Sequence, residues 1–367
     1  MVAYRARVYE KGDDEQIVDL LVTSFDGWPK FDIQCNSIEH WRWKYLDNPV
    51  GPLLIFVVEK EGVIVGSYHS VPRLVNIEGH TVLGSIDADV CTHPDHRRKG
   101  VYNMILDFLE PIIPRKDVIF WYGIESNPIL IKKHIHDGTD KVAPHKAALY
   151  IRVKDLDRHL SVTSSNFSFI KKMGYRFFEK KNDFFNRASL RSNVSHYDIV
   201  RTYRFEKQVD DLFKKVKNYY HYIIERDSDY LNWRYCDPRG GDYHIWSAFH
   251  EKNLLGFVVS RINCYQEDYP TGHILDLIYD PTRLDVADAL LKIALSDFDE
   301  NKVNITHYLG ITDNPLDTVV KSNGYVNSRK QILWTYEWLS PVTEYANIFK
   351  KLPSERVYFT YGDIDWI

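Results

Sequence analysis

The chain contains little of what marks redox or metal chemistry. Only four of its 367 residues are cysteines, and no two of them have the Cys-x-x-Cys spacing of a zinc or dithiol site. The pairs His93-x-x-His96 and His134-x-His136 have spacings seen among metal ligands, but neither comes with a clear third ligand. No metal and no disulfide framework are therefore expected, and a reduced, cytoplasmic location is the simplest assumption.

Long apolar runs and an excess of positive charge are also missing. The strongly apolar segments, such as residues 53–58, are far shorter than the roughly 20 residues that span a bilayer, and no secretory leader is expected after Met1. Lysine and arginine number 47 against 51 aspartates and glutamates, which gives a formal net charge of −4. Without a dominant basic field, neither a nucleic acid nor a membrane is expected as a partner.

The chain does contain one internal repeat. Trp43-Lys44-Tyr45 recurs as Trp233-Arg234-Tyr235, at an offset of 190 residues. Offsets between 186 and 191 residues relate Val18-Asp19-Leu20-Leu21 to Val209-Asp210-Asp211-Leu212, Pro94 to Pro281, Asn127-Pro128 to Asn314-Pro315, and Gly138 to Gly324. Because accidental matches would scatter, these offsets predict two copies of one α/β domain in tandem.

Each copy is predicted to form a central mixed β-sheet flanked by helices, because strand-like runs alternate with helix-like runs and hairpins. We expect an N-terminal domain over residues 1–160, a helical connector over 161–196 and a second domain over 197–340. Residues 341–367 form a C-terminal extension with an aromatic ending that carries two aspartates and the terminal carboxylate. This extension either lines the active site or docks as a strand for stability.

Residues 90–105 are the most informative segment. They are typical of a strand that breaks at Pro94, passes through a basic turn and enters a helix. The turn, Arg-Arg-Lys-Gly at residues 97–100, lies where free backbone N–H groups, the positive end of the helix dipole and three cations converge. Its spacing matches neither of the two well-known nucleotide loops, so it predicts a different diphosphate carrier. The alternative is a solvated basic surface loop.

This arrangement resembles the GNAT superfamily of acyl-CoA-dependent N-acyltransferases, whose signature after the fourth strand is Gln/Arg-x-x-Gly-x-Gly/Ala. Arg97 to Gly100 match its first four positions, and Tyr102 replaces the usual small final residue. The resemblance implies that the fourth strand splays from the fifth and holds the acyl-pantetheine in the gap. The cofactor-binding residues that it implies are Val90, Cys91, Thr92, Arg97, Arg98, Lys99, Gly100, Val101, Tyr102 and Asn127. Cys91 itself is expected to be a small core residue, because no His or Asp pattern activates it as a nucleophile.

The second copy differs at the turn. There the sequence is Asp280-Pro281-Thr282-Arg283-Leu284-Asp285, with no glycine and a single arginine flanked by two aspartates. Carboxylates repel a diphosphate, so only the N-terminal copy is expected to bind the cofactor.

The resemblance also implies a general acid. The family commonly places a tyrosine that protonates the leaving thiolate four residues before the glycine closing its final motif. Here that position is His134, four residues before Gly138, whereas the second copy has Val320. Imidazole can donate a proton near neutral pH, so His134 is the candidate acid; the alternative is a polar helix end.

Three carboxylates are candidates for the general base: Asp87 and Asp89 on the fourth strand and Glu125 on the fifth. Residues i and i+2 of a strand share one face, so Asp87 and Asp89 are expected to form an acidic pair that attracts an amine. Alternatively, these aspartates line a solvated face or pair with Lys or Arg. Asp276 has the position of Asp89 in the second copy.

Together with the internal repeat, the resemblance implies a tandem GNAT protein that acts as an acetyl-CoA-dependent N-acetyltransferase. It would use acetyl-CoA as co-substrate and no metal, and transfer the acyl group directly to a primary amine of a small polar acceptor in a ternary complex. The chain is expected to be a monomer or a homodimer. Two alternatives are a FemAB-like aminoacyl or peptidyl transferase, although those proteins usually lack the Arg-x-x-Gly turn, and a non-catalytic acyl-CoA-binding or scaffold protein.

Overall fold

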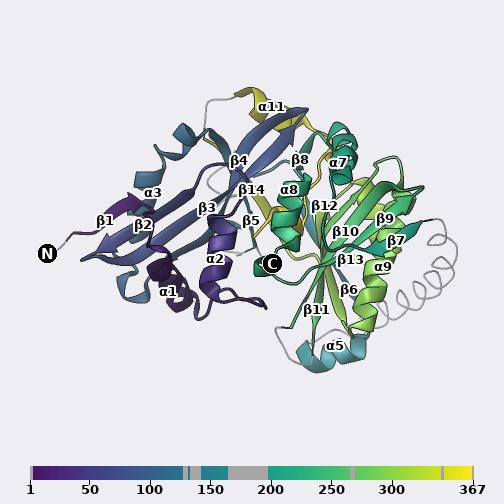
Figure 1. The fold of residues 1–367 in the computed structure, drawn as a ribbon, viewed down its shortest axis with the longest axis horizontal. Helices are drawn as coiled ribbons and strands as arrows, with labels where there is room; N and C mark the ends of the chain where they lie inside the picture. Colours follow the sequence, from purple (N-terminus) through teal and green to yellow (C-terminus); the bar gives the residue numbers. More distant parts are fainter. Residues whose placement is uncertain are drawn as a thin grey trace. The chain divides into compact units, whose positions relative to one another are not determined.

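Figure 1 shows the computed structural model of the chain, which describes residues 3–126, 131–132, 142–163, 197–264, 269–339 and 343–365. The chain divides into two compact units. Unit 1 comprises Met1–Pro144, Asp237–Gly241 and Leu333–Lys351, and unit 2 comprises His145–Cys236, Asp242–Ile332 and Leu352–Ile367. Among the described residues, no helix combines the length and the apolar character needed to cross a bilayer.

Unit 1 is built on one mixed sheet. Its strands, in spatial order, are β1 (Arg5–Val8), β2 (Leu54–Lys60), β3 (Val63–Ile77), β4 (His80–Thr92), β5 (Val118–Glu125) and β14 (Leu333–Trp338). β4 and β5 run parallel, and every other neighbouring pair in this order is antiparallel. β2 and β3 are rich in β-branched and aromatic residues, which favour the extended backbone.

Helices cover both faces of this sheet. They are α1 (Asp14–Phe25), α2 (Ser37–Tyr45), α3 (Val101–Leu109) and α11 (Thr343–Lys351), with short 3-10 turns at Pro94–His96 and Ile113–Lys116. Tyr68 packs into the core cluster that contains Val101 of α3, whereas the next residue, His69, accepts a hydrogen bond of 3.0 Å from Trp41 of α2. Because consecutive strand residues point to opposite faces, α2 and α3 lie on opposite sides of the sheet.

Unit 2 repeats this architecture. Its strands, in spatial order, are β7 (Asp198–Arg201), β9 (His244–His250), β10 (Asn253–Asn263), β11 (Thr271–Tyr279), β12 (Ile305–Ile311), β6 (Ala147–Val153) and β13 (Val326–Asn327). The remaining elements are α5 (Leu156–Thr163), α7 (Gln208–Tyr219), β8 (Tyr222–Ile224), α8 (Ser228–Leu231), α9 (Leu284–Glu300) and α10 (Pro315–Ser322). β11 and β12 are again the parallel pair, which confirms the predicted fold class of two mixed sheets flanked by helices.

Each sheet takes a strand from the other half of the sequence. β6 pairs with β12 in unit 2, and β14 pairs with β5 in unit 1. The domain limits expected from the sequence had grouped these two segments the other way round. Periodicity identifies a strand but not its partner, because pairing is decided by contacts far apart in the chain. Residues 164–196 of the predicted connector lie outside the described residues.

The internal repeat extends to individual side chains. Tyr45, which closes the first Trp-Lys-Tyr segment, donates a hydrogen bond of 2.5 Å to Asp89 on β4. Tyr235, which closes the second segment, donates a hydrogen bond of 2.5 Å to Asp276 on β11. The same polar contact thus ties a helical segment to the matching strand in both units.

Candidate active site

β4 separates from β5 halfway along its length. The parallel pairing runs from Leu83 to Ile86 of β4, and beyond Ile86 the described strands show no further pair between the two. The ladder to β3 is irregular in the same stretch, where Asp89 and Val90 lie opposite the single residue Tyr68. Asp89 has a φ of 47°, so β4 carries a bulge there, and bulges bend and re-aim a strand. The splay implied between the fourth and fifth strands is therefore present.

β4 leads directly into the basic turn and α3. Arg98 and Gly100 adopt left-handed conformations, with φ values of 60° and 80°. Among the described residues, a Cβ at Gly100 would meet no atom within 4 Å, so the left-handed backbone conformation is what favours glycine there. The first helical hydrogen bond joins the Met104 amide to the Gly100 carbonyl at 3.0 Å, and no side chain caps the helix. The amides of residues 101–103 therefore precede the helical ladder and are available to an anion.

A recess of about 420 Å³ lies at this helix start. It is lined by Thr92, His96, Arg97, Arg98, Gly100, Val101, Tyr102 and Asn103. The Arg97 guanidinium donates to the backbone carbonyls of Thr92 at 3.2 Å and Ser24 at 3.1 Å, so it also fastens the turn to the end of α1. Arg98 and Lys99 have exposed side chains. The structure thus places Arg97, Arg98 and Gly100 around one concave, positively charged surface, and Lys99 is an exposed residue of the same turn.

Asp87 lies on the α3 face of the sheet beside this surface. Its side chain is solvent-exposed, and it accepts a hydrogen bond from Ser70 at 3.4 Å. The surrounding protein nevertheless raises the pKa of Asp87 to about 6, chiefly by desolvation; hydrogen bonds from Tyr68 and Ser70 oppose the rise and the charge of Glu337 adds to it. An accessible carboxyl with a pKa near neutrality has the properties of a general base. Tyr102 is 51% exposed. Desolvation raises the pKa of Tyr102, and the charge of the nearby Asp87 raises it further.

Asp89 has a different environment. Trp28 and Lys44 donate to its carboxylate at 2.8 and 2.7 Å, in addition to Tyr45. Desolvation by itself would raise the pKa of Asp89, but the electrostatic interactions with Lys44 and His69 and the hydrogen bonds from Lys44 and Tyr45 hold it at about 2. The prediction that Asp87 and Asp89 share one face is wrong, because the bulge interrupts the alternation of β4. Asp89 anchors α2, and Asp87 faces α3.

The remaining residues predicted for the site have different environments in the structure. Cys91 is buried with its Sγ 3.3 Å from the Ser67 hydroxyl, and desolvation raises the pKa of its thiol, as in a core cysteine. Val90 and Thr92 are half-buried along the splayed edge. Glu125 ends β5 opposite Leu333, three residues beyond the last pair with β4. Asn127 and His134 lie outside the described residues, so their predicted roles stay predictions.

The pair His93-x-x-His96 makes contacts within the protein, and the pair His134-x-His136 lies outside the described residues. Within the described part of the chain, no three His, Cys, Asp or Glu side chains gather as metal ligands. The Nδ1 atom of His96 is hydrogen-bonded to the Tyr4 hydroxyl at 2.9 Å, and that of His93 accepts from the Asp95 amide at 3.2 Å.

Three residues around Asp87 were not anticipated from the sequence: Tyr68, Ser70 and Glu337. Ser70 is directly opposite Asp87 in the β3–β4 ladder, and Tyr68 is two residues away on the same strand. Glu337 comes from β14, more than 200 residues along the chain. Tyr68 and Ser70 could have been inferred as neighbours of Asp87 if the register of the β3–β4 hairpin had been known. No pattern in the sequence near β4 indicates that Glu337 lies close to it.

In unit 2 the corresponding gap holds the C-terminal segment of the chain. β11 pairs with β12 only from Thr271 to Ile274, so these strands also separate. Beyond that point the Leu277 amide donates to the Tyr358 hydroxyl at 3.0 Å. A Cβ on Gly362 would lie 2.5 Å from a carboxylate oxygen of Asp276, which shows how closely the segment approaches β11.

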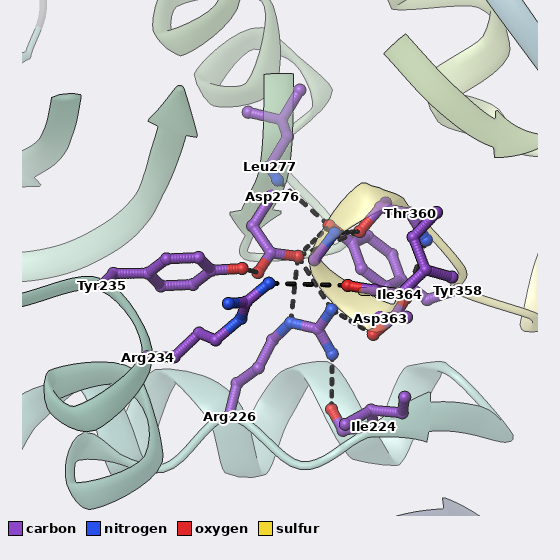
Figure 2. A network of polar contacts seen from close by, with 11 residues as sticks. Ile224, Arg226, Arg234, Tyr235, Asp276, Leu277, Tyr358, Thr360, Asp363 and Ile364 are labelled. Atoms are coloured by element: carbon purple, nitrogen blue, oxygen red, sulfur yellow. Dashed lines mark hydrogen bonds and ion pairs between the residues drawn. The ribbon is translucent and has the colours of Figure 1, made fainter. Parts of the chain in front are cut away.

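A buried ionic network holds this segment in place (Figure 2). Arg226 donates to Asp276 at 2.8 Å and also to Asp363, and each of these side chains is at most 1% exposed. Thr360 adds a hydrogen bond to Asp276 at 3.1 Å. The turn of this copy is also different, because Arg283 pairs with Asp285 at 3.1 Å and Asp280 accepts from the Thr282 amide. In unit 2, therefore, the C-terminal segment lies against β11 where this strand separates from β12, and the turn lacks the basic residues of the turn in unit 1.

Comparison with known proteins is consistent with this geometry. Residues 5–123 match the family model described as an acetyltransferase (GNAT) domain. A search of curated proteins gave no match.

Solved structures with a similar fold include three acyltransferase-related proteins. A probable N-acyltransferase from Enterococcus faecalis is 12% identical with a TM-score of 0.60, over 92% of this chain and 73% of that one. A GCN5-related N-acetyltransferase from Anabaena variabilis is 10% identical with a TM-score of 0.60, over 92% and 73%. N-myristoyltransferase from Saccharomyces cerevisiae, with bound myristoyl-CoA, is 10% identical with a TM-score of 0.61, over 92% and 83%. At these identities the likeness establishes the fold and not the substrate.

Proposed function

We propose that this chain, whose residues 5–123 match the model of an acetyltransferase (GNAT) domain, is a member of the GNAT superfamily and transfers the acetyl group of acetyl-CoA to a primary amine of a small polar acceptor. The observation that carries the proposal is the continuity of the site along β4. An open helix start with basic side chains lies at one end of the splayed edge, and a carboxyl of raised pKa lies at the other.

The residues present fit an acyl-CoA thioester. The amides of residues 101–103, with Arg98 and Lys99, suit a pyrophosphate. Between Thr92 and Asp87 the splayed edge extends about 16 Å, at roughly 3.3 Å per residue, and offers backbone groups to a pantetheine arm. Val90 corresponds to Leu277 by the offset that relates Asp89 to Asp276, and the Leu277 amide already donates to a hydroxyl in unit 2. We assign the Val90 amide the matching task of donating to the thioester carbonyl.

The transfer then requires little covalent chemistry from the protein. Asp87 takes a proton from the acceptor ammonium, and the neutral amine nitrogen bonds to the carbonyl carbon. The Val90 amide donates to the oxygen on which negative charge develops. The carbon–sulfur bond breaks, and the thiolate takes a proton from a donor, the role predicted for His134. The excess proton on the newly bonded nitrogen then replaces the one that the donor gave, which leaves the neutral amide.

Calorimetry with CoA and mass spectrometry of amines incubated with acetyl-CoA test this proposal. We expect one CoA per chain, acetylation of at least one amine, and a rate that falls below pH 6 because Asp87 must be ionised. Asp87→Asn should lower kcat about a hundredfold or more with CoA affinity nearly unchanged. Arg98→Ala should weaken CoA binding by roughly tenfold through the loss of a charge-assisted contact. CoA binding without acetylation of any amine would favour the non-catalytic alternative.

A further inference from the structure

The backbone of β4 turns the amide of Val90 toward the side on which β5 has separated. The amide of His93 donates to the Val65 carbonyl of β3 at 2.9 Å. Cys91, two residues earlier, pairs with Ser67 of the same strand. Along an antiparallel ladder, the backbone groups of successive residues point alternately toward and away from the neighbouring strand. Because those of Cys91 and His93 face β3, the N–H of Val90 faces the opposite edge, which borders the gap.

The carbonyl at the other end of this peptide unit is held by a buried histidine. His69 of β3 is 0% exposed, and its Nδ1 atom lies 3.3 Å from the carbonyl oxygen of Asp89. The C=O of Asp89 and the N–H of Val90 belong to one planar trans peptide, so they point in opposite directions. A contact that draws this carbonyl toward β3 therefore directs the N–H toward the gap. Contacts on both sides of Val90 thus give the same orientation.

A further contact fixes which nitrogen of His69 carries the hydrogen. The indole N–H of Trp41 on α2 donates to the Nε2 atom of His69 at 3.0 Å. Desolvation lowers the pKa of His69 to about 4, against the opposing charge of Asp89, so the ring is neutral at pH 7. Since an indole nitrogen can only donate, Nε2 accepts and the single hydrogen of the neutral ring lies on Nδ1. His69 therefore donates to the Asp89 carbonyl.

Asp89 is held in a backbone conformation that it would otherwise avoid. Its φ of 47° lies in the left-handed region, which is unfavourable for a residue other than glycine and persists only where surrounding contacts impose it. Trp28, Lys44 and Tyr45 hold the side chain of Asp89, and His69 holds its carbonyl. The orientation of the Asp89–Val90 peptide is therefore fixed from both the side chain and the main chain.

We infer that His69 is a positioning residue of the proposed reaction: with its hydrogen set by Trp41, it fixes the Asp89–Val90 peptide so that the Val90 N–H faces the gap in which the thioester carbonyl is to be polarised. His69 acts through the backbone and does not touch the substrate. Donation to the Asp89 carbonyl also polarises the peptide unit, which strengthens its N–H as a donor. The inference rests on the proposed function and names the residue that prepares the donor for the developing oxyanion.

Three variants test the inference in turnover. His69→Leu removes the donor, whereas His69→Asn keeps one, because the asparagine amide nitrogen is as many bonds from Cβ as Nδ1 is. In His69→Leu, kcat should fall by about tenfold or more while the Kd of acetyl-CoA stays within about threefold, and His69→Asn should recover most of kcat. Ser67→Ala is the matched control: it removes a buried hydroxyl, 3.3 Å from the Cys91 sulfur, from the same face of β3. The control should keep the wild-type kcat.

A spectroscopic measurement does not depend on turnover. In acetyl-CoA labelled with ¹³C at the thioester carbonyl, a hydrogen bond to the carbonyl oxygen moves the carbon signal to higher frequency. We expect this shift for acetyl-CoA bound to the wild type and to His69→Asn, and a return toward the free position in His69→Leu. Trp41→Phe should give a partial return, because it allows the hydrogen of His69 to move to Nε2; it also decides the question if His69→Leu does not fold. ¹⁵N NMR of the free protein should show the His69 hydrogen on Nδ1.

Three results would overturn the inference while leaving acetyl transfer intact. They are an equal carbonyl signal in the wild type and the variants, a wild-type His69 with its hydrogen on Nε2, and a loss of kcat in Ser67→Ala as large as that in His69→Leu. If acetyl-CoA binds and no amine is acetylated, the proposed function fails, and the NMR signals alone decide whether His69 orients the Val90 amide.

Discussion

The buried network of unit 2 gives the sharpest test of how the C-terminal segment is held (Figure 2). Arg226→Met keeps most of the side-chain volume and removes the charge that Asp276 and Asp363 share. Both carboxylates are fully buried, so the variant leaves two like charges without the arginine that they share. Breaking a buried pair costs about 3–5 kcal/mol, which corresponds to a fall in Tm of about 6–20 °C for a domain of this size.

The cost should depend on pH in a defined direction. Desolvation raises the pKa of Asp363 to about 6, opposed by the charge of Arg226. Without Arg226 the pKa of Asp363 rises further. Below pH 6 its carboxyl therefore takes up a proton, and only one of the two buried negative charges remains. The deficit of Arg226→Met relative to the wild type should therefore be smaller at pH 5 than at pH 8.

Differential scanning calorimetry at the two pH values measures this comparison. Arg283→Met is the control: Arg283 pairs with Asp285 at the surface, where such pairs contribute about 0–1 kcal/mol. Arg226→Met combined with Asp363→Asn should recover part of the loss. A deficit below 1 kcal/mol at pH 8, or an equal deficit at pH 5, would refute the reasoning that the segment is held by this network.

The other predictions concern unit 1. Gly100→Glu should abolish CoA binding measured by calorimetry, because it strains a left-handed position and adds a negative charge, whereas Arg283→Ala in unit 2 should leave binding unchanged; the reverse result would exchange the roles of the units. Asp89→Asn should cost roughly 2 kcal/mol in urea unfolding at pH 7; since the pKa of Asp89 is lowered to about 2, this deficit should shrink as pH falls from 4 to 2. His134→Ala should lower kcat about a hundredfold with CoA affinity intact, and wild-type turnover would return His134 to a polar helix end.

The sequence predicted the parts of the site that local chemistry specifies. The strand, the basic turn with Gly100 and the following helix form a contiguous stretch, so backbone conformation, charge and helix start can all be inferred together. The repeat likewise predicted two equivalent units, and the shared Tyr45–Asp89 and Tyr235–Asp276 contacts follow from it. The loss of the basic turn in the second copy could be inferred from the sequence by the same comparison of the two copies.

The acidic pair shows where such inference stops. Alternation along β4 predicted that Asp87 and Asp89 share one face. The bulge adds one residue to β4 in its ladder with β3, so the two side chains project to opposite faces. A bulge depends on how β4 is bent against β3 and released from β5, which the order of residues in β4 does not reveal.

By itself, the sequence determined the repeated α/β fold, the basic turn and the loss of that turn in the second copy, because each is encoded in residues adjacent along the chain. Only the tertiary structure decided that β6 and β14 belong to the opposite sheets, that the charge of Glu337 on β14 acts on Asp87, and that the C-terminal segment lies in the gap of unit 2. These features arise from pairing between distant segments, which is selected by packing and buried charge over the whole unit and leaves no trace in any one stretch of sequence.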